Sequence, residues 1–236
     1  MATLPSRAGT KGVPRITRER QILAAATEEF GRQGYEATTM AAVAARVGVT
    51  KPLLHQYFGG KQDLYLACLG PIGDRLLDAV RTATAGHGAD TRPAPLRVLH
   101  ALFTALDGQR EAWFVLYDAT LPPDSDAARL AARYRDAIDD LAAIGTADLL
   151  HPAGSADPAD ADALDADPLD ADALKHAWRG LCTALVRWWI KHPDQSPDAM
   201  TRRCQRLFAA APGMLAGTGD RTAAAGRAPL APPQNP

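Results

Sequence analysis

Two short helical patterns meet at a tight turn between residues 40 and 58, and this junction constrains the fold more than any other feature of the chain. Apolar residues recur at helical spacing in the first pattern, which stops at Gly48. Thr50 is placed to cap the next helix, and Pro52 suits its first turn because no amide hydrogen is needed there. The spacing predicts a helix-turn-helix unit, whose second helix would enter the major groove of DNA.

Helical patterns continue on both sides of this unit. We expect a helix that begins after Thr17 and ends at Gly34, and a later one that begins after Gly60. The later helix contains Gly70-Pro71, where a kink or break is expected because proline removes a hydrogen bond. Further amphipathic helical stripes run on to residue 208 and indicate an all-α fold, with an N-terminal three-helix domain and a helical C-terminal domain.

Changes in composition suggest the domain boundaries. We expect a flexible arm at 1–14, the helix-turn-helix domain at 15–61, a helical ligand-binding and dimerisation domain at 62–211, and a disordered tail at 212–236. Within the second domain, residues 152–171 read as an acidic low-complexity linker. Its Asp-x-Asp pattern leaves metal binding as an alternative, but the glycine turn and terminal glutamate of a calcium loop are missing.

The composition is that of an ordinary soluble chain, large enough at 236 residues and 47% hydrophobic content to bury a core. The sequence has neither a run of ~18 apolar residues nor a signal-peptide pattern at its start, so we expect a cytoplasmic location. Cys68, Cys182 and Cys204 are scattered along the chain. Their spacing indicates buried small hydrophobes in place of a disulfide framework or a zinc site.

The net charge of −1 conceals an uneven distribution. Residues 1–61 carry nine Lys/Arg against four Asp/Glu, a net of +5, which leaves −6 for the remainder. Clustered positive charge would supply salt-dependent affinity for DNA phosphates, whereas the acidic remainder would be repelled from the duplex. The charge pattern therefore assigns nucleic-acid binding to the N-terminal domain.

A series of motifs between Thr17 and Leu69 resembles the TetR (tetracycline repressor) family of bacterial regulators in order and spacing. These motifs are Arg20–Ala26 running into Glu29-Phe30, the segment Gly34–Thr39, the turn Gly48–Lys51, the pair Tyr57-Phe58, and Lys61 followed by the next helix at Leu64. The rest of the chain matches the family only in being helical and of suitable length.

The exposed face of the second helix of the unit is expected to contact DNA. Lys51 can bond guanine or a phosphate, Gln56 can pair with adenine, and Leu53 can only offer an apolar contact. Threonines at helix starts suit phosphate binding, although simple capping is equally compatible with them. Leu53 and His55 depart from the residues common in the family, which bears on the operator sequence. The full predicted set is Thr38, Thr39, Thr50, Lys51, Pro52, Leu53, His55, Gln56, Tyr57 and Lys61.

The resemblance also implies a ligand pocket and a dimer interface in the C-terminal domain. For the pocket we name His100, Phe103, Trp113, Phe114, Tyr117, Tyr134, Trp178 and Arg179, although plain core packing is the alternative for each aromatic residue. The family pairs its last two long helices into a four-helix bundle. For that interface we name Leu185, Trp188, Trp189, Cys204, Leu207 and Phe208.

These features together favour a bacterial, nucleoid-associated homodimeric repressor that binds a palindromic operator and is released by a small hydrophobic or aromatic ligand. An activator would carry the same signature. We expect no cofactor, no metal and no enzymatic activity, because candidates such as His100, Asp118 and His176 lack a nucleophile elbow, metal-ligand spacing or a phosphate loop. The alternative is a helical interaction module that acts through its acidic linker or tail without DNA.

Overall fold

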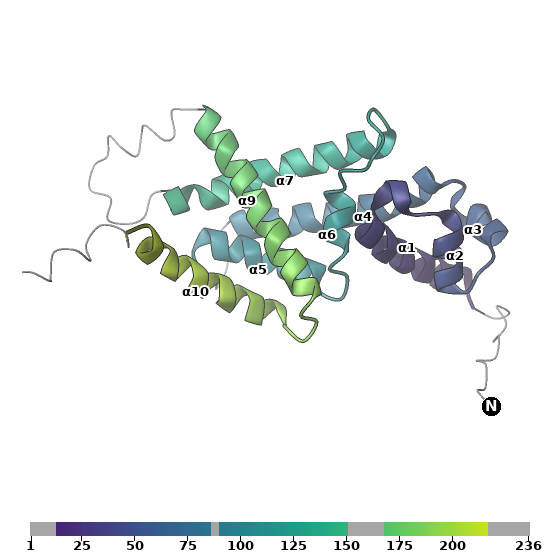
Figure 1. Ribbon diagram of the computed structural model, residues 1–236, viewed down its shortest axis with the longest axis horizontal. Helices are drawn as coiled ribbons and strands as arrows, with labels where there is room; N and C mark the ends of the chain where they lie inside the picture. Colours follow the sequence, from purple (N-terminus) through teal and green to yellow (C-terminus); the bar gives the residue numbers. More distant parts are fainter. Residues whose placement is uncertain (1–12, 86–89, 151–167, 217–236) are drawn as a thin grey trace, which may run out of the picture.

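The protein is elongated, and its helices form a small group at one end and a larger group at the other (Figure 1). The computed structural model describes residues 13–85, 90–150 and 168–216. The helices of the small group are α1 (Arg15–Ala37), α2 (Met40–Val47) and α3 (Lys51–Phe58). The remaining helices are α4 (Lys61–Thr84), α5 (Ala94–Leu106), α6 (Ala112–Leu116), α7 (Asp126–Leu150), α9 (Pro168–Ile190) and α10 (Pro197–Ala216). An all-α fold with an N-terminal helix-turn-helix is therefore confirmed.

The small group begins and ends its helices largely where the sequence predicts. Gly48 ends α2 in the left-handed conformation, at φ 71°, which glycine adopts without steric cost. Gly34 has φ 80° and interrupts α1 near its end, as expected. The start of α1 differs from the prediction, because the helix begins at Arg15 after Pro14 and Thr17 does not cap it.

Helix α4 extends from the small group into the larger one, so of the kink or break predicted at Gly70-Pro71, the break is wrong. The helix is continuous from Lys61 to Thr84 with Pro71 inside it. A side chain on the residue before proline would clash with the proline ring in a helix, and Gly70 has none. Leu64, Cys68, Ile72, Leu76 and Val80 are all buried, so packing along the whole helix offsets the lost hydrogen bond.

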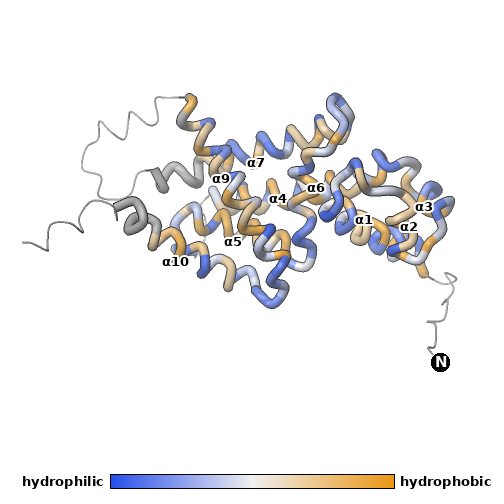
Figure 2. Tube along the Cα trace, viewed as in Figure 1, coloured by the Kyte–Doolittle hydropathy of each residue, from blue (hydrophilic) through white to orange (hydrophobic). Residues whose placement is uncertain are grey.

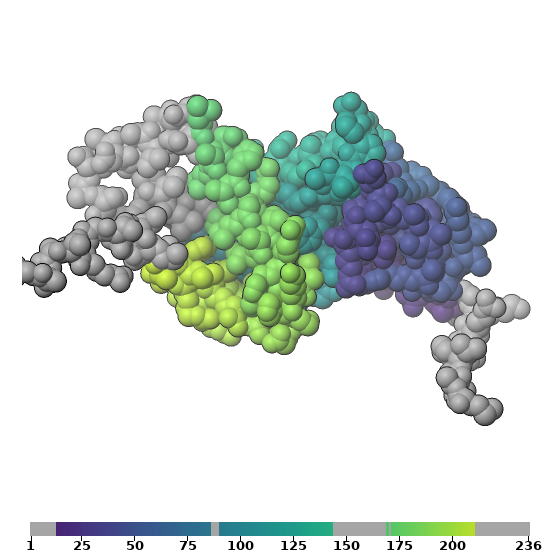
Figure 3. Space-filling view, viewed as in Figure 1, coloured from purple at the N-terminus to yellow at the C-terminus, as the bar shows by residue number. Residues whose placement is uncertain are grey.

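The larger group packs around α4, which contacts α5 on one side and α7 on the other. Apolar and polar residues alternate along these helices at helical spacing (Figure 2). The largest side chains buried in this part of the core include Trp113, Trp189, Phe103, Leu99 and Leu106. In the space-filling view the two groups meet without a gap on the face shown (Figure 3). The core is thus continuous from the small group to α10.

Two predicted boundaries in the C-terminal part differ from the structure. Residues 212–216, assigned to a disordered tail, belong to α10. Residues 168–171 of the predicted linker form the first turn of α9. The arm at 1–12, the remaining linker at 151–167 and the tail at 217–236 lie outside the described residues.

Cys68, Cys182 and Cys204 are free thiols in the core, so their predicted burial is confirmed. Burial raises the pKa of the Cys68 thiol to about 12 and that of Cys204 to about 11. Across the described ranges, no helix combines the length and apolar character needed to span a membrane.

Candidate DNA-binding interface

Helix α3 presents one exposed face at the end of the molecule farthest from α10 (Figure 1). Lys51, Pro52, His55 and Gln56 are exposed, whereas Leu54 is fully buried. Residues four apart lie one above the other on a helix, so Lys51 stands with His55 and Pro52 with Gln56. Leu53 and Tyr57 are half-buried at the edges of this face. The four exposed side chains therefore form one surface on an α-helix, an element that the major groove of DNA admits.

Both helices of the turn are capped by threonine. Thr39 accepts a hydrogen bond from the amide of Ala42 at 3.1 Å, and Thr50 accepts one from Leu53 at 3.3 Å. Thr39 and Thr50 are exposed. The free amide groups of a capped helix start attract anions, and a threonine hydroxyl keeps a hydrogen to donate while its oxygen accepts. The geometry at these two residues is therefore compatible with both capping and phosphate contact.

The imidazole of His55 is oriented by its own helix end. Its Nδ1 lies 2.5 Å from the carbonyl oxygen of Gly59. A carbonyl oxygen only accepts, so Nδ1 must carry the hydrogen. In the neutral ring, Nε2 is then left as an acceptor. The neutral form of His55 thus presents a hydrogen-bond acceptor on this face, beside the donor Lys51 and the amide of Gln56.

Thr38 and Lys61 are predicted to contact phosphates, but in the structure their side chains bind carbonyl groups of the protein. Thr38 is 1% exposed, and its hydroxyl donates to the carbonyl of Gly34 at 2.8 Å. The Nζ of Lys61 donates to the carbonyls of Thr38 at 2.9 Å and Glu36 at 3.2 Å, and lies 4.4 Å from the ring centroid of Tyr35. Both side chains therefore fix the junction between α1 and α2.

Arginines near the start of α1 add basic side chains that the predicted set of DNA contacts does not include. The guanidinium of Arg15 lies 5.5 Å from the ring centroid of Tyr57, which connects the start of α1 with the edge of α3. Arg18 and Arg20 follow on the same helix, and among the described residues none of the three forms an ion pair. Arg46, in contrast, pairs with Glu28 at 3.0 Å. The contact between Arg15 and Tyr57 depends on how α1 and α3 pack, so the sequence alone could not place the start of α1 beside α3.

A buried carboxylate fastens this domain to the rest of the protein. Asp118, just after α6, is 6% exposed and accepts a hydrogen bond from the backbone amide of Tyr35 at 2.6 Å. Its other oxygen accepts from the amide and the hydroxyl of Thr120, each at 2.7 Å. The hydroxyl of Thr120 in turn accepts from the amide of Glu36 at 3.1 Å. The end of α1 is therefore tied to the segment after α6 by a hydrogen-bond network.

Tyr65 of α4 extends this network through its hydroxyl group. Its hydroxyl lies 2.6 Å from the carbonyl of Val115 and 3.3 Å from Asp118, and its ring packs edge-on against Phe30 and Tyr35. Burial first, and then the Asp118 charge, raises the pKa of Tyr65 far above its ordinary value. Three elements, α1, α4 and the end of α6, thus meet at one polar centre inside the apolar core.

The backbones of α1 and α6 also approach each other closely. A Cβ atom built on Gly31 would lie 2.3 Å from the carbonyl oxygen of Glu111. Next to it, the carboxylate of Glu111 contacts Arg32 at 3.3 Å. Glycine at position 31 is therefore required by the distance between the two helices, a reason that no local sequence pattern reveals.

The residues predicted for a ligand pocket are spread over several environments. Phe103, Trp113 and Trp178 are buried in the core, and Phe114 and Tyr117 are half-buried against it. The hydroxyl of Tyr134 donates to Asp74, and Arg179 pairs with the buried Asp139. His100 instead lines a groove between α4 and α5.

The residues predicted for a dimer interface divide into two sets. Trp188 and Leu207 are 38% and 57% exposed, and Leu185 lines the same shallow groove between α9 and α10. Trp189 and Cys204 lie differently from the prediction, because both are fully buried within the protomer. Phe208 is half-buried beside the groove. An apolar face with two large exposed side chains therefore remains on the last two helices.

The sequence candidates for catalysis have separate partners. His100 Nδ1 lies 3.2 Å from the Thr201 hydroxyl, Asp118 belongs to the network described above, and His176 contacts its own helix through the carbonyl of Asp172. Among the residues that the structure describes, no group of His, Cys, Asp or Glu side chains is arranged to hold a metal ion.

Comparisons with known proteins agree with this geometry. Residues 22–68 match the family described as bacterial regulatory proteins, tetR family. The chain is 35% identical over 106 residues to the HTH-type transcriptional activator FasR of Mycolicibacterium smegmatis, which covers 45% of this chain and 48% of that protein. It thus spans about half the length of the curated relatives it matches.

Two solved structures are similar over most of their length. A TetR-family transcriptional regulator from Bordetella parapertussis has a TM-score of 0.60 at 20% identity, covering 83% of this chain and 95% of that one. A TetR-like transcriptional regulator from Rhodococcus sp. RHA1 has a TM-score of 0.54 at 25% identity, covering 86% and 99%.

The fold and the exposed α3 face define a helix-turn-helix protein with a large helical C-terminal domain. Residues 22–68 match the TetR family of bacterial regulators, and the overall fold is similar to those of the two solved regulators.

Proposed function

We propose that the protein is a transcriptional regulator that acts as a homodimer and binds a palindromic DNA operator through α3. The observation that carries this proposal is the exposed face of Lys51, His55 and Gln56 on α3, together with the threonine caps at the starts of α2 and α3. These side chains offer donors and an acceptor to base edges, and the helix starts offer amide groups to phosphates. DNA binding by such a protein implies a cytoplasmic location.

The exposed apolar face of α9 and α10 supports the dimer. Trp188 and Leu207 would leave water if two copies paired these helices, and burial of apolar area stabilises such an interface. Arg203 lies over the Trp188 ring at 5.2 Å and would form part of the polar rim. A two-fold dimer presents two copies of α3 to successive major grooves, which requires half-sites roughly 34–36 Å apart or a multiple of that distance.

Release by a small molecule requires a physical route from the C-terminal domain to α3. The Asp118 network offers one, because it joins α1 to α4 and α6 through the amide of Tyr35 and the hydroxyl of Tyr65. A ligand that favours a conformation with misplaced recognition helices weakens DNA binding, and DNA weakens ligand binding by the same factor. Such couplings amount to about 1–3 kcal/mol.

The direction of regulation depends on where the operator lies. We propose repression, in which the bound dimer blocks the promoter. The similarity to a protein named as an activator, FasR, makes activation the second candidate. A promoter–reporter fusion with and without the regulator distinguishes the two, because repression lowers reporter output and activation raises it.

The test of DNA binding begins with selection of duplexes from a random pool by the purified protein. We expect an enriched palindrome whose affinity falls steeply with salt. Lys51→Ala combined with Gln56→Ala should abolish the enrichment, whereas the matched pair Lys191→Ala and Gln33→Ala, exposed residues outside α3, should retain it. Equal binding by both double variants would refute the assignment of α3, and a lack of enrichment at low salt would favour a helical interaction module.

A further inference from the structure

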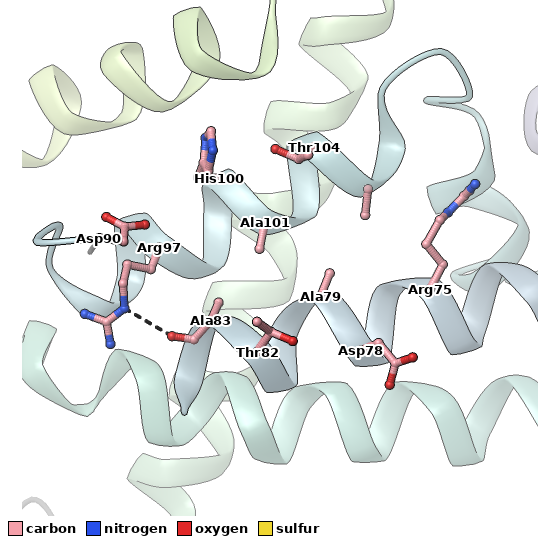
Figure 4. Close-up of a pocket in the computed structure, with 11 residues that line it drawn as sticks. Arg75, Asp78, Ala79, Thr82, Ala83, Asp90, Arg97, His100, Ala101 and Thr104 are labelled. Atoms are coloured by element: carbon pink, nitrogen blue, oxygen red, sulfur yellow. Dashed lines mark hydrogen bonds between the residues drawn. The ribbon is translucent and has the colours of Figure 1, made fainter. Parts of the chain in front are cut away.

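Helices α4 and α5 leave a groove of about 510 Å³ between them. Its floor consists of small side chains, and charged or polar groups surround it (Figure 4). The floor residues are Ala79 and Ala83 of α4 and Ala101 and Ala105 of α5. The groove is thus an apolar surface within reach of polar side chains, which suits a ligand that has both kinds of surface.

The carboxylates at this groove are already neutralised. Asp78 pairs with Arg81, and Asp90 pairs with Arg92 at 2.8 Å. Hydrogen bonds from Arg92 lower the pKa of Asp90 to about 2, so this carboxylate stays ionised and paired. The lining arginines Arg75 and Arg97 form no ion pair with any residue that the structure describes. The groove therefore has an excess of positive charge and complements an anion.

The two arginines are engaged to different degrees. Arg97 donates through Nε to the carbonyl of Ala83 at 3.1 Å and through Nη1 to the carbonyl of Arg92 at 2.8 Å, so it ties α5 to the end of α4. Arg75, at the opposite end of the groove in Figure 4, donates to the side chain of Gln109 at 3.2 Å. Removal from water lowers the pKa of Arg75.

A guanidinium group has five donors, and a carboxylate can take two of them in parallel. Arg75 has donors to spare beyond its bond to Gln109, whereas Arg97 holds two backbone carbonyls in place. Along α4, the eight steps from Arg75 to Ala83 span about 12 Å at 1.5 Å per residue. An occupant of this length would lie on the alanine floor with its acidic group at the Arg75 end.

We propose that the α4–α5 groove binds an organic carboxylate with an elongated apolar body, that Arg75 pairs with its carboxylate, and that this ligand is the effector of the regulator. The last part rests on the proposed function. Because α4 also carries Lys61, which donates to the carbonyl of Thr38, and Tyr65, whose ring packs against Tyr35 of α1, an occupant that separates α4 from α5 would alter the position of the DNA-binding domain.

The binding test is calorimetric titration of the full-length protein, without DNA, with decanoate below its micelle concentration. Decanol and decylamine serve as neutral and cationic probes with the same apolar body. We expect decanoate to bind once per protomer and decanol at least about ten-fold more weakly, because charge-assisted hydrogen bonds to arginine are lost. Decylamine should bind more weakly still. Equal affinity for decanoate and decanol would overturn the proposal.

Variants locate the site. Arg75→Met should reduce the affinity for decanoate to that for decanol, whereas Arg133→Met, which removes an exposed arginine of α7 outside the groove, should not. Ala101→Leu should fill the floor and abolish binding of both probes, with thermal unfolding used to verify the fold. Unchanged decanoate affinity in Arg75→Met or in Ala101→Leu would refute the groove as the site.

A separate experiment tests whether the ligand is the effector. The selected operator is titrated with the protein, with and without decanoate. A weaker operator affinity in the wild type that is absent in Arg75→Met supports the regulatory part. Decanoate binding without any change in operator affinity would overturn that part alone, and failure to bind DNA at all would refute the proposed function while leaving the groove measurement intact.

Discussion

Replacement of Asp118 by asparagine tests whether a buried carboxylate fastens the DNA-binding domain. The substitution Asp118→Asn keeps the shape of the side chain and changes one oxygen to an amide nitrogen, which only donates. The amide of Tyr35 and both groups of Thr120 point hydrogens at the present carboxylate. If the remaining oxygen faces Thr120, the nitrogen meets the Tyr35 amide at 2.6 Å, donor against donor.

The magnitude follows from these contacts. A hydrogen bond to a charged group contributes about 1.5–3 kcal/mol, and a buried donor left without a partner costs a similar amount. The bonds that remain become neutral and lose roughly half their strength. We therefore expect Asp118→Asn to lower the free energy of unfolding by about 2–3 kcal/mol, a large part of the 5–15 kcal/mol typical of a protein.

Urea unfolding followed by circular dichroism measures this change. The matched control is Asp124→Asn, because Asp124 is exposed and its φ of 61° suits asparagine as well as aspartate. Hydrogen exchange adds a local readout, since the Tyr35 amide should lose protection in Asp118→Asn alone. An unfolding free energy within about 0.5 kcal/mol of the wild type would refute the reasoning.

Four further changes have defined outcomes. Gly31→Ala should destabilise the protein by about 1–3 kcal/mol in urea because its Cβ would meet the Glu111 carbonyl at 2.3 Å, and a neutral result would contradict that approach. A Cβ added at Gly48 would have nothing within 4 Å, so Gly48→Ala should lower the free energy of unfolding only by about 1–2 kcal/mol, the cost of its left-handed backbone. The same urea unfolding measures this change. Burial, followed by the charge of Arg92, lowers the pKa of His100 in the folded protein. The unfolded chain therefore binds a proton at His100 more readily than the folded protein does, and the free energy of unfolding should fall as the pH drops below about 6.5. His100→Gln should reduce this fall, and an unchanged pH profile would contradict it. Leu207→Asp should convert the proposed dimer to monomers in sedimentation, whereas the exposed Ala132→Asp should not.

Local features of the DNA-binding domain could be predicted from the sequence because they depend on neighbours a few residues apart. Gly48 at a helix end, Thr50 at a cap and Pro52 in a first turn each act within one turn of helix. The same reasoning identified the buried stripe of α4. These elements need no knowledge of distant segments.

Features that depend on distant segments could not be predicted in this way. Thr38 and Thr39 look alike as cap candidates, but only Thr39 accepts a hydrogen bond from α2, while Thr38 turns inward. Trp188 and Trp189 are adjacent, and the helix phase that exposes one and buries the other is set by packing against α5. Asp118 meets the Tyr35 amide across 83 residues of chain.

Pro71 divides α4 into two segments with different neighbours. Before it, Tyr65 contacts α6 and Cys68 contacts α1, whereas Arg75, Ala79 and Ala83, after it, line the groove. The carbonyl four residues before a helical proline has no amide hydrogen to bind, so the helix bends there at the lowest energetic cost. A disturbance in the groove would then reach the DNA-binding domain as a tilt about this point. Such a tilt changes the distance between the two recognition helices of a dimer, so that the spacing of operator half-sites, and not their base sequence, would be the property to which regulation is sensitive.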